Sequence, residues 1–177
     1  MLIADYMDGA YKVTKVLHLL AVMAGLGVTF WYGVYGMRAK KAGESGDAMG
    51  SAGIAEANDF VGRLAEKVIY TIPVFGVGLV FMSGDVLEFS QTWVWLALVL
   101  FAVGLTNATV VLMPSARKIA ELSRELASMG PPPAGAQGPP PQVAAMDALG
   151  KKLGMFSGIN HMLVVVILYL MVAKPGL

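Results

Sequence analysis

The chain of 177 residues contains only two histidines, and both lie in long apolar stretches. His18 lies in KVLHLLAVMAGLGVTFWYGVYG, and His161 lies in MFSGINHMLVVVILYLMVAKP. An ionisable ring in hydrocarbon usually faces the interior of a helix bundle, and neutral imidazole is a common ligand of metals, including haem iron. The leading hypothesis is therefore a cofactor site, with His18 and His161 as metal ligands.

Small residues share a helix face with each histidine. At intervals of three or four residues along the two segments these are Ala21, Gly25, Thr29, Gly154, Ser157 and Gly158. Small side chains let a flat ring or another backbone come close. The pattern predicts contacts to a cofactor, for which we single out Gly25 and Asn160. The alternative interpretation is tight helix packing, in which each histidine bonds across an interface.

The composition is that of a membrane protein. Hydrophobic residues make up 56% of the chain and charged residues only 14%, whereas a soluble domain carries about a quarter. The absence of cysteine excludes disulfides, thiolate metal sites and cysteine nucleophiles. The formal net charge of +1 argues against a nucleic-acid partner. No P-loop, HExxH motif or intramembrane carboxylate pair supports a hydrolase or a nucleotide-driven enzyme.

Four segments approach the ~20 apolar residues that span a bilayer. They cover about residues 11–37, 63–84, 92–113 and 152–172. Each must be helical, because an isolated strand would leave its backbone groups unpaired in lipid. We therefore expect residues 1–177 to form a single transmembrane domain, an all-α integral membrane four-helix bundle with up-down topology.

Lysine and arginine predict the orientation of this bundle, because cytoplasmic connections carry an excess of both. Ten of the 13 lie in the connections after the first and third segments: Arg38, Lys40, Lys41, Arg63, Lys67, Arg117, Lys118, Arg124, Lys151 and Lys152. The opposite side has Lys12, Lys15 and Lys174. Both termini are therefore expected on the outer, periplasmic side of a bacterial inner membrane.

Depth in the membrane separates the two histidines. His18 lies towards the outer side and His161 slightly inward of the centre of its segment, a difference of roughly 13 Å. One haem held between them is therefore not expected. Met82 and Met171 match the depth of His18 better, and a His/Met pair suits haem b or, near the outer surface, Cu(I). Apolar filling is the alternative for these methionines, since the chain has 12.

The long connections are expected in the cytoplasm. Residues 38–62 are small, polar and rich in glycine, which predicts a flexible loop. Pro114 is expected to interrupt the third helix, and residues 114–129 to form an amphipathic helix at the membrane surface. Residues 130–141 form a proline-rich linker, for which a plain spacer is preferred over a docking site for a proline-binding partner.

Polar residues also lie deep in the apolar segments. Asn107 and Asn160 need hydrogen-bond partners there. We expect them either to bond each other and join the third helix to the fourth, or to line a substrate or quinone pocket. Pro73 predicts a kink in the second helix.

Short motifs along the chain resemble those of known membrane proteins. They are Lys12–Lys15–Leu17–His18, Arg63 to Glu66, Pro73, Met113–Pro114, Asn160–His161 and Lys174–Pro175. Together they resemble a family of small four-helix integral membrane proteins of unknown function. They are also distantly similar to HemJ-type protoporphyrinogen oxidases and CopD-type copper-resistance membrane proteins.

The HemJ likeness implies that His18 is a ligand of haem b. It also places Asn160 at an asparagine near the start of the last helix, and Lys174–Pro175 at the closing Lys-Pro. The third segment, TWVWLALVLFAVGLTNATVVLM, departs from the pattern because it lacks the lysine and histidines of that family. The second candidate ligand of that family is thus missing, and His161 is an additional ring.

Four functions follow from these observations. The leading one is a b-type haem protein that transfers electrons or forms the membrane subunit of a redox complex. The alternatives are a cofactor-free accessory subunit of a larger membrane complex, copper handling through His18 and the methionines, and a HemJ-like oxidase. The expected partners are the lipid bilayer and other membrane subunits, and a homo-oligomer is compatible with the sequence.

Overall fold

The computed structural model describes residues 9–130 and 138–175, and every regular element in these two ranges is helical. In chain order the helices are α2 (Gly9–Thr29), α3 (Tyr32–Glu44), α4 (Ala48–Ile69), α5 (Thr71–Phe81), α6 (Thr92–Asn107), the π-helix η1 (Ala108–Leu112), α7 (Met113–Met129) and α8 (Pro141–Ala173). The all-α class expected from the sequence is confirmed.

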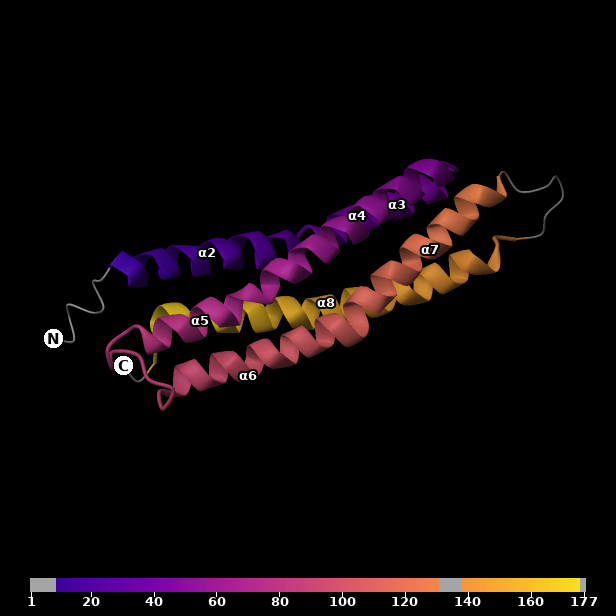
Figure 1. Ribbon diagram of the computed structural model, residues 1–177. Coiled ribbons are helices and arrows are strands. Elements are labelled where there is room, and N and C mark those ends of the chain that lie inside the picture. Colours follow the sequence, from indigo (N-terminus) through magenta and orange to yellow (C-terminus); the bar gives the residue numbers. More distant parts are fainter. Residues whose placement is uncertain (1–8, 131–137, 176–177) are drawn as a thin grey trace. The chain divides into compact units, whose positions relative to one another are not determined.

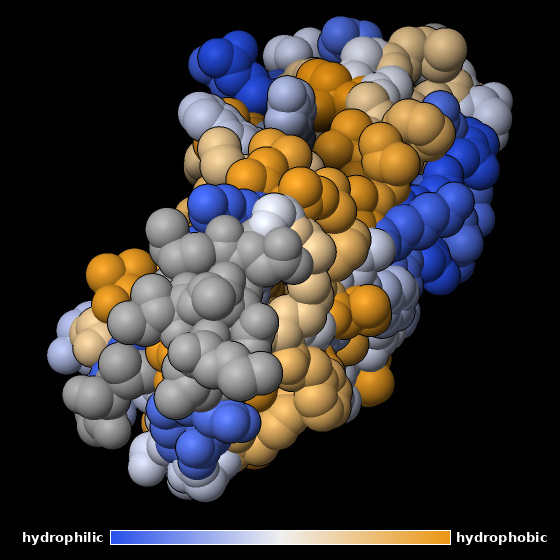
Figure 2. Space-filling model, turned by 60° about the vertical axis from the view of Figure 1, so that its left-hand side comes forward, coloured by the Kyte–Doolittle hydropathy of each residue, from blue (hydrophilic) through white to orange (hydrophobic). Residues whose placement is uncertain are grey.

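Consecutive helices combine into four long rods. These are Gly9–Glu44, Ala48–Phe81, Thr92–Met129 and Pro141–Ala173, and each is long and apolar enough to cross a membrane. Rods of 33 to 38 residues are longer than the ~20 residues that cross a hydrocarbon core. Of the most apolar part of each rod, only 6–11% is buried within the chain, which leaves a large apolar surface for lipid or other protein to cover. Figure 2 shows the resulting apolar surface in orange.

The chain divides into two compact units. Unit 1 comprises Met1–Phe30, Leu64–Leu105 and His161–Leu177, and unit 2 comprises Trp31–Arg63 and Thr106–Asn160. In unit 1 the start of α2, the end of α5, the start of α6 and the end of α8 lie at the same end (Figure 1). Successive helices of unit 1 therefore run in opposite directions.

An apolar cluster forms the core of unit 1 at that end. Its buried members are Leu87, Trp93, Val94, Ala97 and Leu170. They come from the turn before α6, from the first turns of α6 and from the last turns of α8. The cluster therefore joins the ends of helices that are far apart in the sequence.

Two of the rods are broken inside their apolar parts. The first rod breaks at Phe30–Trp31, between α2 and α3, and the second breaks at Tyr70, between α4 and α5. The second break has a covalent cause: Pro73 lacks an N–H, and its ring crowds the carbonyl of the residue four positions earlier, Ile69. The helix is therefore interrupted at Tyr70, three residues before the proline for which a kink was expected.

The third rod does not end at Pro114, and the expected interruption there is wrong. The rod continues from α6 through η1 into α7, and Pro114 is the second residue of α7. The carbonyl that Pro114 would crowd in a regular helix belongs to Val110, which lies inside the π-helix. The wider π-helical turn lets the rod continue past the proline.

The flexible loop expected over residues 38–62 is also wrong. Only Ser45–Asp47 lie outside helices, and the side chain of Asp47 accepts a hydrogen bond of 2.8 Å from the N–H of Gly50 in α4. Small residues are buried along this hairpin: Ala39, Ser51, Ala52 and Ala55. The composition that predicted a loop instead allows close packing of α3 and α4, as at Gly43, where a Cβ would lie 3.3 Å from Oγ of Ser51.

The helix expected over residues 114–129 is present as α7, and it packs against other parts of unit 2. Its buried residues Ala120, Leu122 and Ser123 face protein, and Ser123 Oγ lies 3.9 Å from Sδ of Met146 on α8. Residues 131–137 of the expected 130–141 linker lie outside the described residues. The last helix begins at Pro141, well before the expected start at residue 152.

Candidate functional site

His18 lies half-buried on α2 and hydrogen-bonds to the backbone of α5. Its Nδ1 lies 3.1 Å from the carbonyl oxygen of Ile72. A carbonyl oxygen can only accept, so Nδ1 must carry the proton and Nε2 must be the unprotonated nitrogen. Within the described part of the chain, no residue hydrogen-bonds to Nε2 of His18. The free lone pair of this ring is therefore on Nε2.

A glycine provides the space for the His18 ring. A Cβ at Gly76 would lie 3.2 Å from Cε1 and 3.6 Å from Nδ1 of His18. The first of these distances is shorter than ordinary van der Waals contact between carbons. The ring therefore sits over the bare backbone of α5 at Gly76.

Helix α2 packs against α5 before His18 and against Ile69, the last residue of α4, after it. A Cβ at Gly25 would lie 2.9 Å from Cγ1 of Ile69, and a Cβ at Gly78 would lie 3.8 Å from Cγ2 of Thr14. The space beside Gly25, where the sequence suggested a cofactor contact, is thus filled by Ile69. This favours the alternative interpretation of the small-residue face of α2, which is close approach of another helix.

The two methionines proposed as ligands have different surroundings. Met82 follows α5, and its Sδ accepts a hydrogen bond of 3.7 Å from Oγ1 of Thr14, one helical turn before His18. Met171 packs instead against the apolar cluster at the end of α8. Met82 is therefore the methionine that contacts α2 one turn before His18, whereas Met171 lies in apolar surroundings.

His161 lies on α8 and bonds to the end of α2. Its Nε2 lies 3.2 Å from the carbonyl oxygen of Thr29, the last residue of α2. Its ring stacks on Phe30 with centroids 4.4 Å apart and an interplanar angle of 14°. The last carbonyls of a helix lack donors within the helix, and His161 supplies one. The proton of the neutral ring is therefore on Nε2.

The two histidines contact α2 at different levels. Thr29 lies 11 residues beyond His18 on the same helix, which corresponds to roughly 16 Å along its axis. This separation agrees with the expectation that a single haem is not held between the two rings.

Asn107 and Asn160 meet in unit 2. Nδ2 of Asn107 donates to Oδ1 of Asn160 at 2.9 Å and to the carbonyl oxygen of Phe156 at 3.1 Å. The first of the two arrangements expected from the sequence, a polar link between the third and last helices, is confirmed. Asn160 therefore acts as a helix-to-helix contact in the structure.

With this geometry established, comparison with known proteins places the chain in a family. A family profile described as "Predicted integral membrane protein (DUF2269)" matches residues 12–175. The chain belongs to this family. No curated protein matches the chain, and no solved structure does.

The family assignment agrees with the four rods and covers both histidines. It establishes an integral membrane protein that contacts the lipid bilayer. It supports the resemblance to a family of small integral membrane proteins and adds nothing for the distant likeness to HemJ-type or CopD-type proteins.

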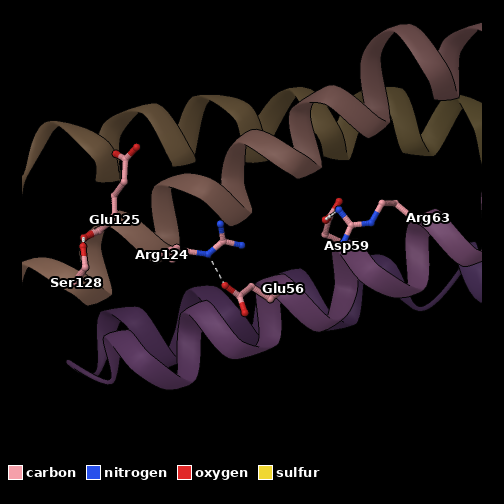
Figure 3. Close-up of polar contacts among 6 residues, drawn as sticks. All are labelled: Glu56, Asp59, Arg63, Arg124, Glu125 and Ser128. Atoms are coloured by element: carbon pink, nitrogen blue, oxygen red, sulfur yellow. Dashed lines mark hydrogen bonds and ion pairs between the residues drawn. The ribbon is translucent and has the colours of Figure 1, made fainter.

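In this DUF2269 chain, ion pairs between distant segments of unit 2 were not anticipated from the sequence. Arg124 on α7 pairs with Glu56 on α4 at 2.6 Å, as Figure 3 shows, and Lys40 on α3 pairs with Asp147 on α8 at 2.8 Å. All four side chains are about half exposed or more. Glu56 lies in residues 38–62, where the sequence predicted a loop, and Asp147 precedes the expected start of the last helix, so neither pair could be anticipated.

Proposed function

We propose that this protein is a b-type haem protein of the bacterial inner membrane, with His18 as an axial ligand of the iron through Nε2. Such a protein transfers electrons or serves as the membrane subunit of a redox complex. The observation that supports the proposal is the hydrogen bond between Nδ1 of His18 and the Ile72 carbonyl, which leaves Nε2 available.

This arrangement matches what a metal-bound histidine requires. A ligating imidazole usually donates its other N–H to a carbonyl or carboxylate, which fixes the tautomer and the ring orientation. Because α2 and α5 are in direct contact at Gly76, no other group fits between the His18 ring and the backbone of α5 at this position. When bound, haem would supply one-electron chemistry, and the protein would supply ligation and an apolar surrounding.

Besides His18, one further residue of unit 1 is a candidate that would hold the haem. His161 engages its Nε2 with Thr29, so it is not placed as the opposing ligand. Met82 lies next to Thr14, one turn from His18 on α2, and a His/Met ligand pair raises the potential of haem iron. We therefore assign Met82 as the candidate second ligand.

The charge distribution supports an orientation with both termini in the periplasm. Lys12 and Lys15 precede His18, whereas the charged extensions of unit 2 carry most of the lysine and arginine. The positive-inside rule then puts the connections after the first and third apolar segments in the cytoplasm. His18 lies near the outer side of the membrane in this orientation.

A reduced-minus-oxidised visible spectrum of the detergent-purified protein, with pyridine haemochromogen quantification, tests the haem proposal. We expect a Soret band and an α-band that correspond to a single haem per chain. His18→Gln should abolish both bands, because it removes the iron ligand while keeping a polar side chain of similar size.

His161→Gln is the matched control, and it should retain the haem because this ring is not placed as a ligand. A colourless wild-type protein, expressed with ample haem supply, would contradict the proposal. Equal loss of haem in both variants would contradict the assignment of His18 alone.

The second candidate function is a cofactor-free accessory subunit. It is favoured by the use of both histidines as hydrogen-bond donors between helices and by the filling of the Gly25 face by Ile69. Such a subunit would be colourless and would copurify with a larger membrane complex from native membranes.

The hypotheses of copper handling and of oxidase activity can be tested on the same purified protein. A Cu(I) site would bind copper without a Soret band and would lose affinity in Met82→Leu, since thioethers are soft ligands. A HemJ-like enzyme must oxidise protoporphyrinogen.

A further inference from the structure

We propose that Gly76 and the backbone carbonyl of Ile72 together position His18, fixing its proton on Nδ1 and presenting Nε2 as the ligand atom. Neither glycine nor isoleucine has a side chain that can bind a metal, so the residue types alone do not indicate this role. The consequence for bound haem rests on the proposed function, whereas the tautomer of His18 can be measured without it.

The Ile72 carbonyl is a well-placed acceptor. It belongs to the first turn of α5, immediately before Pro73 and two residues after the break at Tyr70. Ile72 is only 6% exposed, so little water competes for this carbonyl. A hydrogen bond in a region of low dielectric is stronger than one in water. The 3.1 Å contact therefore holds the proton on Nδ1 of His18.

Gly76 is required for the ring to reach that carbonyl. An added Cβ would lie 3.2 Å from Cε1 of His18, so the ring would have to move by a few tenths of an ångström. Nδ1 is the next nearest atom, at 3.6 Å from the added Cβ. Movement away from α5 lengthens the bond from Nδ1 to Ile72, which is already near the upper end of the normal range of about 2.7–3.2 Å.

Gly78 on the same helix provides a matched control. A Cβ there would lie 3.8 Å from Cγ2 of Thr14, which is ordinary van der Waals contact. Gly76→Ala and Gly78→Ala therefore make the same chemical change in the same apolar helix, two residues apart. Only Gly76→Ala places the added methyl group against the His18 ring.

For bound haem the two variants should differ in reduction potential. The N–H donated to a carbonyl raises the basicity of a ligating imidazole, which favours the oxidised iron. Weakening this bond in Gly76→Ala should shift the midpoint potential upward. A role of Gly76 in helix packing alone would change stability and haem content without this systematic shift.

The first experiment reads the tautomer by NMR of the full-length chain, labelled with ¹⁵N-histidine and purified without added haem. The chain has only two histidines, so His161→Gln assigns the signals. We expect the proton of His18 on Nδ1 in the wild type and in Gly78→Ala, and a loss of this preference in Gly76→Ala. A proton on Nε2 of His18 in the wild type would overturn the inference.

The second experiment measures the midpoint potential of the haem-loaded protein. We expect an upward shift in Gly76→Ala and none in Gly78→Ala, and identical behaviour of the two variants would overturn the inference. The expected tautomers in a protein that binds no haem would contradict the proposed function and leave the positioning of His18 standing. The two failures are therefore distinguishable.

Discussion

The two histidines of this protein differ in the nitrogen that each one commits to the protein. His18 donates from Nδ1 to the Ile72 carbonyl in the first turn of α5, whereas His161 donates from Nε2 to the Thr29 carbonyl at the end of α2. Both rings thus meet the end of a helix that is interrupted within the apolar region. The two rings therefore differ in which nitrogen keeps a lone pair for another ligand: Nε2 in His18 and Nδ1 in His161.

This difference separates a candidate ligand from a structural contact. On His18 the remaining nitrogen is Nε2, the one farther from the main chain and easier for a large group to reach. On His161 the ring is also stacked on Phe30, which covers one of its faces. Two histidines in apolar helices therefore differ in their ability to bind a cofactor, because different backbone carbonyls accept their ring protons.

The largest effect that tests this comparison is expected at Gly25. Gly25→Ala places a methyl group against Ile69 and should destabilise the packing of α2 on the end of α4 by about 1–3 kcal/mol. Unfolding in detergent, followed by circular dichroism against denaturant, measures the change. Gly27→Ala is the control, because a Cβ there meets no atom within 4 Å, and it should be neutral or slightly stabilising. Equal destabilisation by both substitutions would show that this packing does not support the His18 region.

A smaller effect is expected at the His161 contact. Phe30→Leu and His161→Gln, alone and combined, form a double-mutant cycle with a coupling energy of about 0.5–1.5 kcal/mol, because the two rings are stacked. The spectrum of any haem bound through His18 should be unchanged in all three variants. A change in the Soret band of Phe30→Leu would break the distinction between the two histidines.

The smallest effect is expected in unit 2, at the exposed pair of Arg124 and Glu56. Arg124→Gln should lower the unfolding temperature only slightly and should not change the environment of either histidine, because exposed ion pairs contribute little. The difference from the wild type should disappear in high salt, which screens surface charges. A salt-independent loss of stability would instead show that the Arg124 side chain contributes through packing.

The four apolar segments could be predicted from the sequence because the bilayer imposes their length and their helical backbone. The helices in residues 38–62 could not be predicted in this way, because alanine, glycine and serine are compatible with either a loop or a closely packed helix pair. The link between Asn107 and Asn160 was anticipated as one of two arrangements, since buried amides need partners. The continuation of the third rod past Pro114 was missed, because a π-helical turn leaves no simple compositional signal.

By itself, the sequence determined that the protein is an all-helical membrane protein with two histidines in apolar surroundings and with a strong charge asymmetry. These properties follow from composition and from the solvent that each segment can tolerate. Only the tertiary structure decided that His18 keeps Nε2 available, that His161 does not, and that Gly25 contacts Ile69. The reason is that backbone carbonyls from other helices set these outcomes, and neither their identity nor their distance is encoded in the local sequence around each histidine.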